Sequence, residues 1–291
     1  MNSTTSHFPK LIVAIVVMST SGVLARAMDI SPELAIWLRS VIAAMALGLV
    51  LKFMKLPLWI KEAKALTVVV FSTILFGLHW VSYFYALYYS SVAIGMLSLF
   101  TYPVFTAILE PIIVKSKPKL IDIALSFVAF FGVFFLVPDF DLTNDVTLGV
   151  VIGVCSALTY SLRNIMLKLH VQHHSGITLM FMQVIGLSVL LSPIFFLGDM
   201  GVQLDMIAID WWKLLTLGLL TTAIGHTLFV VSFKNFSITV ISILSTLTPL
   251  IGIGLGFLFL DELPQGNVWI GGFLISVAVL VESVKSAKRQ A

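Results

Sequence analysis

Apolar segments of about twenty residues recur along the whole chain, and no other feature of the sequence limits its fold as strongly. Residues 67–88, for example, contain no Asp, Glu, Lys or Arg. An apolar run of about 18 or more residues is typical of a membrane-spanning helix. Charged residues form only 11% of the 291 positions, whereas soluble domains contain about a quarter. We therefore expect an integral membrane protein.

Charges, prolines and polar clusters divide the apolar sequence into about ten spans, each of the length that a helix needs to cross the bilayer core. A barrel strand would alternate polar and apolar residues over about ten positions, and these segments do not. We predict an all-α protein with spans at residues 11–28, 32–51, 67–88, 91–115, 119–137, 146–170, 175–197, 211–233, 238–260 and 265–284.

The basic residues lie mostly on one side of this predicted bundle. When both termini are placed in the cytoplasm, only Arg26 and Lys213 fall on the far side, and Arg39 lies within the second span. The outer segments are acidic, with residues such as Asp205, Asp210 and Glu262. Cytoplasmic loops carry an excess of Lys and Arg, so cytoplasmic termini are predicted. The cytoplasmic basic residues are Lys10, Lys52, Lys55, Lys61, Lys64, Lys115, Lys117, Lys119, Arg163, Lys168, Lys234, Lys285, Lys288 and Arg289.

Several classes of function are disfavoured by what the sequence lacks. It contains one cysteine, Cys155, which excludes an internal disulfide and a multi-cysteine metal site. It has no phosphate loop or nucleophile–base motif, so we expect no enzyme activity, cofactor, metal or nucleic-acid partner. Ala25-Arg26-Ala27 follows an apolar run as in a signal-peptide cleavage site, but the arginine and the repeat described next favour an uncleaved first span.

The two halves of the chain resemble each other. Residues 90–109 align with 236–255 and pair Pro103 with Pro249, while His79 and His226 fall within one residue of the same register. Each half holds about five spans, and an odd number forces the second copy to enter the bilayer inverted. Such inverted repeats are typical of secondary transporters, whose substrates bind near the midplane between the halves. The predicted units are a first repeat at 1–138, a second at 146–284 and a basic cytoplasmic tail at 285–291.

Four segments carry a resemblance to a known family: AIWLRSVIAAMAL (35–47), TYPVFTAIL (101–109), STLTPLIGIGLGFLFLDEL (245–263) and WIGGFLISVAVLV (269–281). They are similar to the arginine-bearing second helix, the proline-led fourth and ninth helices and the glycine-rich last helix of EamA-type carriers. These belong to the drug/metabolite transporter superfamily and include the YddG-like exporters. The resemblance implies a carrier of small metabolites, usually an exporter of amino acids or other amphipathic compounds, in a plasma membrane such as the bacterial inner membrane.

The sequence departs from this family in two places. Lys115-Ser116-Lys117 follows the fourth span, where the ninth span has the acidic pair Asp261-Glu262. Met18-Ser19-Thr20 replaces the aromatic residue that is common early in the first helix of the family. The second departure weakens any transfer of substrate identity from the family to this chain.

His79 lies midway along the third span, where it cannot reach either headgroup layer. Trp80 is adjacent, and Tyr83 shares its helix face at i+4. Polar groups inside the bilayer usually face the bundle interior or a water-filled cavity, so these residues predict a substrate-binding wall. The alternative is a structural histidine bonded to a neighbouring helix. His226 presents the same choice without aromatic partners in sequence, and the repeat places it on the opposite wall.

The buried arginines allow two interpretations each. Arg39 lies seven residues after Pro32, and we favour an ion pair with Asp29 or Glu33, structural or gating, over substrate binding. Arg163 follows Tyr160 near the cytoplasmic end, where it either holds a substrate carboxylate at the inner mouth or anchors the helix. Gln183 aligns loosely with Arg39 and could bridge helices.

Further candidates lie in the fourth and ninth spans. Glu110 either pairs with Lys115 or acts as a proton-coupling carboxylate. Pro103 and Pro249 each remove a helical hydrogen bond and permit bending, which suits a gating role in a rocking carrier. The remaining predicted substrate-binding residues are Ser98, Tyr102, Tyr160, Arg163 and Ser245, of which Ser98 and Tyr102 share a face with Phe105 and Ser245 shares one with Ser242 and Pro249.

A secondary transporter that works by alternating access is the function that these features favour most. Only two basic groups are available inside the membrane, so an amino acid is preferred over a sugar phosphate. Carriers for other metabolites or drugs, an intramembrane enzyme and a channel are the alternatives. Proton coupling, transport direction and the choice between monomer and homodimer are left open by the sequence.

Overall fold

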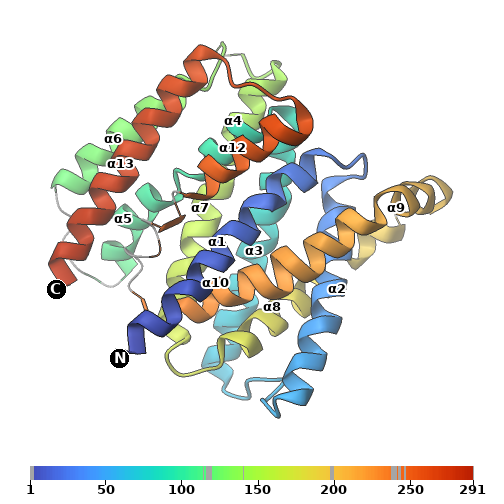
Figure 1. Cartoon of the computed structure of the whole chain (residues 1–291). Coiled ribbons are helices and arrows are strands. Elements are labelled where there is room, and N and C mark those ends of the chain that lie inside the picture. The colour runs from blue at the N-terminus through green and yellow to red at the C-terminus, as the bar shows by residue number, and fades with distance from the viewer. Residues whose placement is uncertain are drawn as a thin grey trace.

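The structure, a computed structural model, describes residues 3–113, 115, 120–139, 141–196, 200–236, 241, 244–245 and 247–290. Its regular elements are all helices, joined by short loops (Figure 1). They are α1 (Ser3–Arg26), α2 (Pro32–Phe53), α3 (Ala63–Tyr89), α4 (Val92–Leu99), α5 (Tyr102–Ile113), α6 (Leu120–Phe134), α7 (Asp145–His170), α8 (Gly176–Leu190), the 3₁₀ helix η1 (Ser192–Phe196), α9 (Met200–Leu215), the π-helix η2 (Thr216–His226), α10 (Thr227–Ser232), α12 (Leu247–Leu260) and α13 (Gly266–Gln290).

These elements confirm the predicted all-helical membrane fold. Within the described residues, 7 helices are long and apolar enough to cross a membrane. Three of them are composite: α4 and α5 form one, α8 and the start of η1 form another, and α9, η2 and α10 form the third. The shorter apolar helices α6, α12 and α13 supply the other three of the ten predicted spans.

The eighth span begins earlier than the predicted residue 211, because α9 already starts at Met200. Asp205 and Asp210 were predicted to lie in an outer loop, but both lie on this helix. Asp210 is 1% exposed. Lys213 donates to its Oδ1 at 2.6 Å, and the backbone N–H of Asp29 donates to its Oδ2 at 3.2 Å. A buried carboxylate with both partners is compatible with a helix inside the bundle.

Helices of the first half pack mainly against helices of the second half. α3 packs along α7 and α8, α2 along α8 and η2, and α1 along α12 and η2. α6 and α13 form a separate pair at one side of the bundle (Figure 1). The interior, where α1, α3 and α7 meet, is therefore built from both halves.

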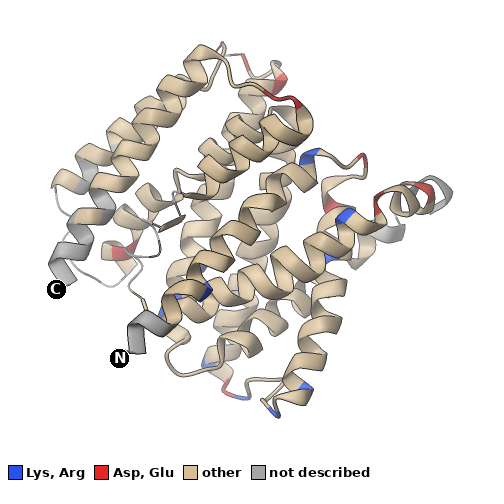
Figure 2. Cartoon of the chain, in the orientation of Figure 1, with Lys and Arg blue, Asp and Glu red and all other residues tan. Residues whose placement is uncertain are grey.

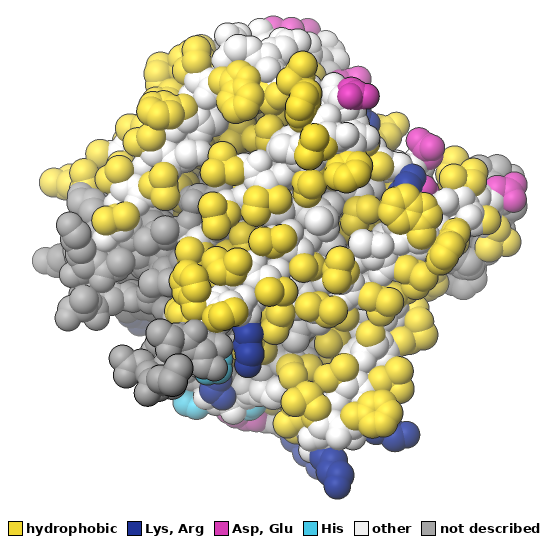
Figure 3. Space-filling view, viewed as in Figure 1, with side chains coloured by type: hydrophobic (Ala, Val, Ile, Leu, Met, Phe, Trp, Pro, Cys, Tyr) yellow, Lys and Arg dark blue, Asp and Glu magenta, His cyan; other side chains and the backbone are white. Residues whose placement is uncertain are grey.

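Apart from the buried Arg39 and Arg163, most charged side chains among the described residues lie toward the two ends of the bundle. Most Lys and Arg residues lie at the lower end as drawn, and most Asp and Glu residues lie at the upper and right-hand end (Figure 2). On the face drawn in Figure 3, the described surface between them is largely hydrophobic. Large apolar side chains are strongly exposed to the surroundings, such as Phe127, Leu258 and Phe259, which are 72%, 69% and 71% exposed. Such a band suits the hydrocarbon core of a bilayer.

Glycines permit close contact at two helix pairs. A Cβ on Gly271 of α13 would lie 2.6 Å from the backbone oxygen of Gly132 on α6. On α12, Gly252 faces Met96 and Gly256 faces Val92 of α4, at the GxxxG spacing that lets helices approach. Gly254, between these two glycines, makes no such contact, since nothing lies within 4 Å of a Cβ built at its position.

Candidate functional site

A cavity lies in the interior between helices of both halves. About 50 Å³ of it is open to the centres of water molecules. A water needs about 10–15 Å³ by that measure, so the cavity in this conformation suits a few waters rather than a metabolite. It is lined by Ile15, Met18, Ser21, His79, Trp80, Tyr83, Leu99, Phe100, Tyr102, Tyr160, His226, Phe229, Ser245 and Thr248.

His79 is held in one orientation at the cavity wall. Its ring stacks on Tyr160 with centroids 4.2 Å apart, and it also lies face to face with Tyr83 at 6.2 Å. The Ser156 hydroxyl donates to the backbone oxygen of His79 at 2.8 Å and lies 2.8 Å from His79 Nδ1. Since that hydroxyl has one proton, it accepts from Nδ1–H, which leaves Nε2 of a neutral ring as an acceptor.

His226 lies at the end of the π-helix η2, and its surroundings differ from the prediction. The sequence suggested no aromatic partners, but the Trp80 and Phe76 rings meet its ring edge-on at 5.1 and 5.6 Å. These partners come from α3 and are distant in sequence. Within the described residues, Nδ1 of His226 is buried and has no hydrogen-bond partner. His226 therefore brings an unused polar group to the same cavity as His79.

Arg39 is 0% exposed, and the predicted ion pair with Asp29 or Glu33 is wrong. Its Nε donates to Thr222 at 2.9 Å, Nη2 to Thr221 at 2.9 Å, and Nη1 to Ser21 at 3.4 Å. Glu33 instead accepts a hydrogen bond from Tyr85. The guanidinium carbon also lies 4.1 Å from the centre of the Trp80 ring, a favourable cation–π arrangement.

The two threonines that hold Arg39 belong to the π-helix. Thr221 and Thr222 both donate their hydroxyls to the backbone oxygen of Leu217, four and five residues back. π-Helical turns are rare and often mark functional sites. Each hydroxyl can donate to the backbone and still accept from the guanidinium. The helix irregularity therefore supplies two neutral acceptors to one buried cation.

Arg163 is also 0% exposed, so it is neither an anchor at the membrane surface nor part of an open inner mouth. Its Nη2 donates to Gln183 Oε1 at 2.6 Å and Nη1 to Asn164 at 3.0 Å. Its guanidinium carbon lies 4.0 Å from the centre of the Phe76 ring. Gln183 in turn donates to Ser72 at 2.9 Å, which confirms that it bridges helices.

The two arginine networks join sets of spans that correspond under the repeat, although the two arginines lie on different members of those sets. One joins Ser21 on the first span, Arg39 on the second and the Thr221–Thr222 pair on the eighth. The other joins Arg163 on the sixth span, Gln183 on the seventh and Ser72 on the third. Each cation stacks on an aromatic ring of α3, and these two rings, Phe76 and Trp80, are themselves 4.0 Å apart.

The fourth span is interrupted beside the cavity. α4 ends at Leu99 and α5 begins at Tyr102, and Pro103 removes the N–H that would continue the ladder. Leu99, Phe100 and Tyr102 line the cavity at this break. Ser98 is not among the residues that line it, since its side chain lies against Gly153 of α7.

The other candidates of these spans lie apart from or at the edge of the cavity. In the ninth span, Ser245 and Thr248 line it, Pro249 is buried one turn beyond Ser245, and Ser242 lies outside the described residues. Glu110 lies on α5, half-buried and away from the cavity. Its predicted ion pair with Lys115 is not formed among the described residues.

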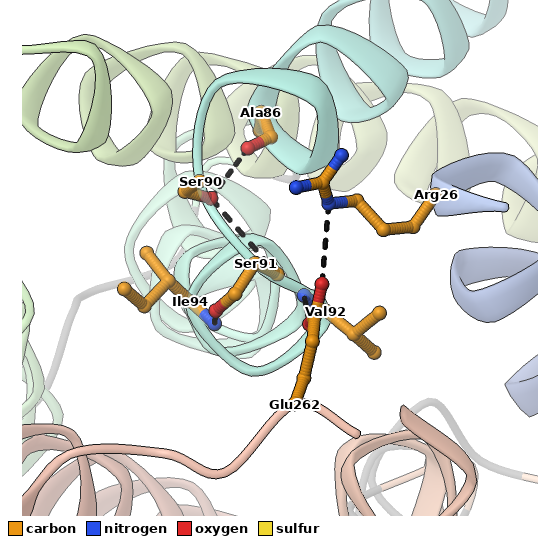
Figure 4. A network of polar contacts seen from close by, with 7 residues as sticks. All are labelled: Arg26, Ala86, Ser90, Ser91, Val92, Ile94 and Glu262. Carbon is orange, nitrogen blue, oxygen red and sulfur yellow. Dashed lines mark hydrogen bonds and ion pairs between the residues drawn. The ribbon is translucent and has the colours of Figure 1, made fainter. Parts of the chain in front are cut away.

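Glu262 connects the end of α1 to the start of α4, two helices that supply residues to the cavity wall or lie next to it (Figure 4). Arg26 Nε, at the end of α1, donates to Glu262 Oε1 at 3.2 Å. The backbone N–H of Val92, at the start of α4, donates to Glu262 Oε2 at 2.7 Å. Ser91 caps the same helix by accepting from the N–H of Ile94. The carboxylate after α12 thus joins α1 and α4, and we call this contact the Arg26–Glu262 latch.

Several of these residues were not singled out from the sequence. Ser21, Ser156, Thr221 and Thr222 are small hydroxyl residues within apolar spans, a common pattern with no functional signal of its own. Phe76 lies one turn before Trp80, so the shared face could have been recognised. Its arginine partner could not, because Arg163 comes from the other half of the chain.

Comparison with family sequence models identifies the family of this chain. The sequence model of the EamA-like transporter family matches residues 10–137 and 147–284. The chain belongs to the EamA-like transporter family. It is accordingly a non-enzymatic secondary transporter of metabolites, an integral membrane protein whose partners are a small-molecule substrate and the bilayer. The two matched segments hold five spans each, as two inverted five-helix repeats require.

Structural comparison supports the same fold. A solved crystal structure has a TM-score of 0.68 to this EamA-like transporter, with 13% sequence identity over 99% of each chain. A likeness at this identity shows the fold alone. No curated protein matches the chain.

Proposed function

We propose that this EamA-like transporter exports small amphipathic metabolites, with amino acids as the favoured class, by alternating access around the cavity of His79 and Tyr160. A bacterial inner membrane and a YddG-like subfamily fit this proposal. The single observation that carries it is an interior cavity, built from both halves, with polar groups set among aromatic rings. Ligand sites typically combine an apolar wall with a few well-placed polar groups.

The cavity offers separate surfaces to the parts of an amino acid. Tyr160, Tyr102 and Phe100 line the cavity with aromatic rings, and such rings suit an ammonium group. Ser21 and the unpaired Nδ1 of His226 lie where a carboxylate could be bound. Ile15 and Phe229 supply apolar wall for the side chain. The narrow free space in this conformation fits an occluded resting state that opens to admit substrate.

The test is saturable uptake of radiolabelled leucine and other amino acids into proteoliposomes, with and without a pH gradient. A matched pair of variants separates the cavity from the lipid surface: Tyr160 is 4% exposed and Tyr88 is 60% exposed. Tyr160→Leu should lower kcat/KM at least about tenfold, since a contact to substrate worth about 1.4 kcal/mol is lost. Tyr88→Leu should transport as the parent does. If both substitutions changed kcat/KM equally, the substrate would not pass through this cavity.

A further inference from the structure

We propose that Arg39 and Arg163 make the cavity selective for organic anions, so the preferred cargo carries a carboxylate and no fixed positive charge. The inference rests on the proposed carrier function and, among small amphipathic metabolites, favours carboxylate anions over the zwitterionic amino acids named above. A 2-oxo acid or an N-acylated amino acid has this chemistry, whereas a free amino acid has it only in part.

The first observation is that both guanidinium groups are buried without a counter-ion. An arginine side chain keeps its charge in proteins. Around Arg39 and Arg163, the hydrogen-bond acceptors among the described residues are hydroxyl, amide and thioether groups, with no carboxylate. Nε of Arg163 has no partner at all within the described chain. A buried charge is normally paired with an opposite charge, so two positive charges here are left uncompensated.

The second observation is that both charges lie directly behind the cavity wall. Arg39 stacks on Trp80 at 4.1 Å and donates to Ser21, and both of these residues line the cavity. Arg163 stacks on Phe76, whose ring contacts the rings of His79 and His226. No Asp or Glu is among the described residues that line the cavity.

The two charges act on a ligand through a medium of low dielectric constant. A unit charge about 8 Å from a guanidinium, at an effective dielectric constant of about 20, gains or loses about thirtyfold in binding. A carboxylate is therefore attracted by both arginines, and a cationic ligand is repelled by both. A zwitterion gains at one end and loses at the other, with only aromatic faces and hydroxyls to receive its ammonium group.

If the cargo is an anion, the membrane potential supplies a driving force for its export. One elementary charge that moves across 100 mV changes in free energy by about 2.3 kcal/mol, which corresponds to an accumulation ratio of about fiftyfold. An inside-negative membrane potential therefore drives an organic anion outward without a coupled proton. Glu110, which lies away from the cavity, is not needed for this mechanism.

Three probes of nearly equal shape test the inference in proteoliposomes: leucine, its 2-oxo acid 4-methyl-2-oxopentanoate, and leucinamide. Uptake is measured at zero potential and at an inside-positive potential set with potassium and valinomycin. We expect the 2-oxo acid to be taken up at least tenfold faster than leucinamide, and its uptake to increase with the inside-positive potential. Arg39→Gln should reduce this ratio at least tenfold, and Arg39→Lys should retain most of it.

The outcomes distinguish the inference from the proposed function. Uptake of leucine in preference to the 2-oxo acid, without dependence on potential, overturns the inference and leaves the amino-acid carrier standing. Uptake of the 2-oxo acid without leucine supports the inference and rejects amino acids as the cargo. Saturable uptake of none of the three probes overturns both. The parent protein alone decides among these outcomes, so the test holds even if Arg39→Gln fails to fold.

Discussion

Replacement of Glu262 by Gln should open one end of the cavity more often. Glu262 accepts hydrogen bonds from Arg26 Nε and from the backbone N–H of Val92, and so ties α1 and α4 to the segment after α12. Gln has the same shape and can still accept from Val92, but it cannot form the ion pair. The substitution therefore weakens the Arg26–Glu262 latch without creating a cavity.

The size of the effect follows from the exposure of the pair. The Arg26 and Glu262 side chains are 37% and 22% exposed, so solvent screens the ion pair to about 0.2–1 kcal/mol. The hydrogen bond from Val92 changes from a charged to a neutral acceptor, a loss of about 1 kcal/mol. Together, about 1–2 kcal/mol shifts the equilibrium toward the open form about 5- to 30-fold.

Labelling of a cavity cysteine measures that shift. Thr248→Cys places a thiol on the cavity wall, in a background where the exposed Cys155 is replaced by Ser. A membrane-impermeant maleimide is applied from each side of the membrane in turn. Glu262→Gln should accelerate labelling about 5- to 30-fold from the side opposite the termini. Asp261→Asn removes a neighbouring charge outside the latch and serves as the control. Equal labelling rates in the two variants would refute a latch at this contact.

Three further predictions concern packing, the arginine network and coupling. Gly271→Val should lower the melting temperature in detergent, because a Cβ would lie 2.6 Å from a backbone oxygen of α6 and such overpacking costs about 1–3 kcal/mol. The control Gly254→Ala places its methyl group in open space and should leave the melting temperature unchanged. Thr222→Val removes an acceptor from Arg39 and should destabilise the protein by about 1–3 kcal/mol in urea titration; an unchanged midpoint would contradict the assigned bond. Glu110→Gln should leave potential-driven uptake unchanged, and loss of a response to a pH gradient would restore its coupling role.

The sequence predicts the membrane architecture well because the bilayer imposes one simple requirement on every span. Apolar runs, short polar turns and the distribution of basic residues then give the number of spans and their arrangement. The early start of α9 was missed because Asp205 and Asp210 indicated a loop. Lys213 lies three residues after Asp210 and forms its ion pair, so this spacing was the available signal.

The site was predictable only in part. His79, Tyr83 and His226 were found because titratable or aromatic polar groups are rare within a span. The partners of Arg39 were not, since Thr221 and Thr222 come from the other half of the chain and lie within a π-helix. Nearby acids such as Glu33 were the obvious partners by sequence distance, but Tyr85 occupies that carboxylate. The hydrogen-bond partners of a buried side chain in another helix depend on tertiary packing, which a local sequence pattern does not reveal.

The most direct test of a carrier built around this cavity is counterflow in proteoliposomes. Labelled substrate outside is measured with and without a high concentration of unlabelled substrate inside, for the parent and for His79→Ala. We expect internal substrate to stimulate uptake by the parent several-fold, because the return of a loaded carrier is faster than that of an empty one, and we expect His79→Ala to lose this uptake. Uptake that rises linearly with concentration, shows no stimulation and persists in His79→Ala would contradict an alternating-access carrier at this site.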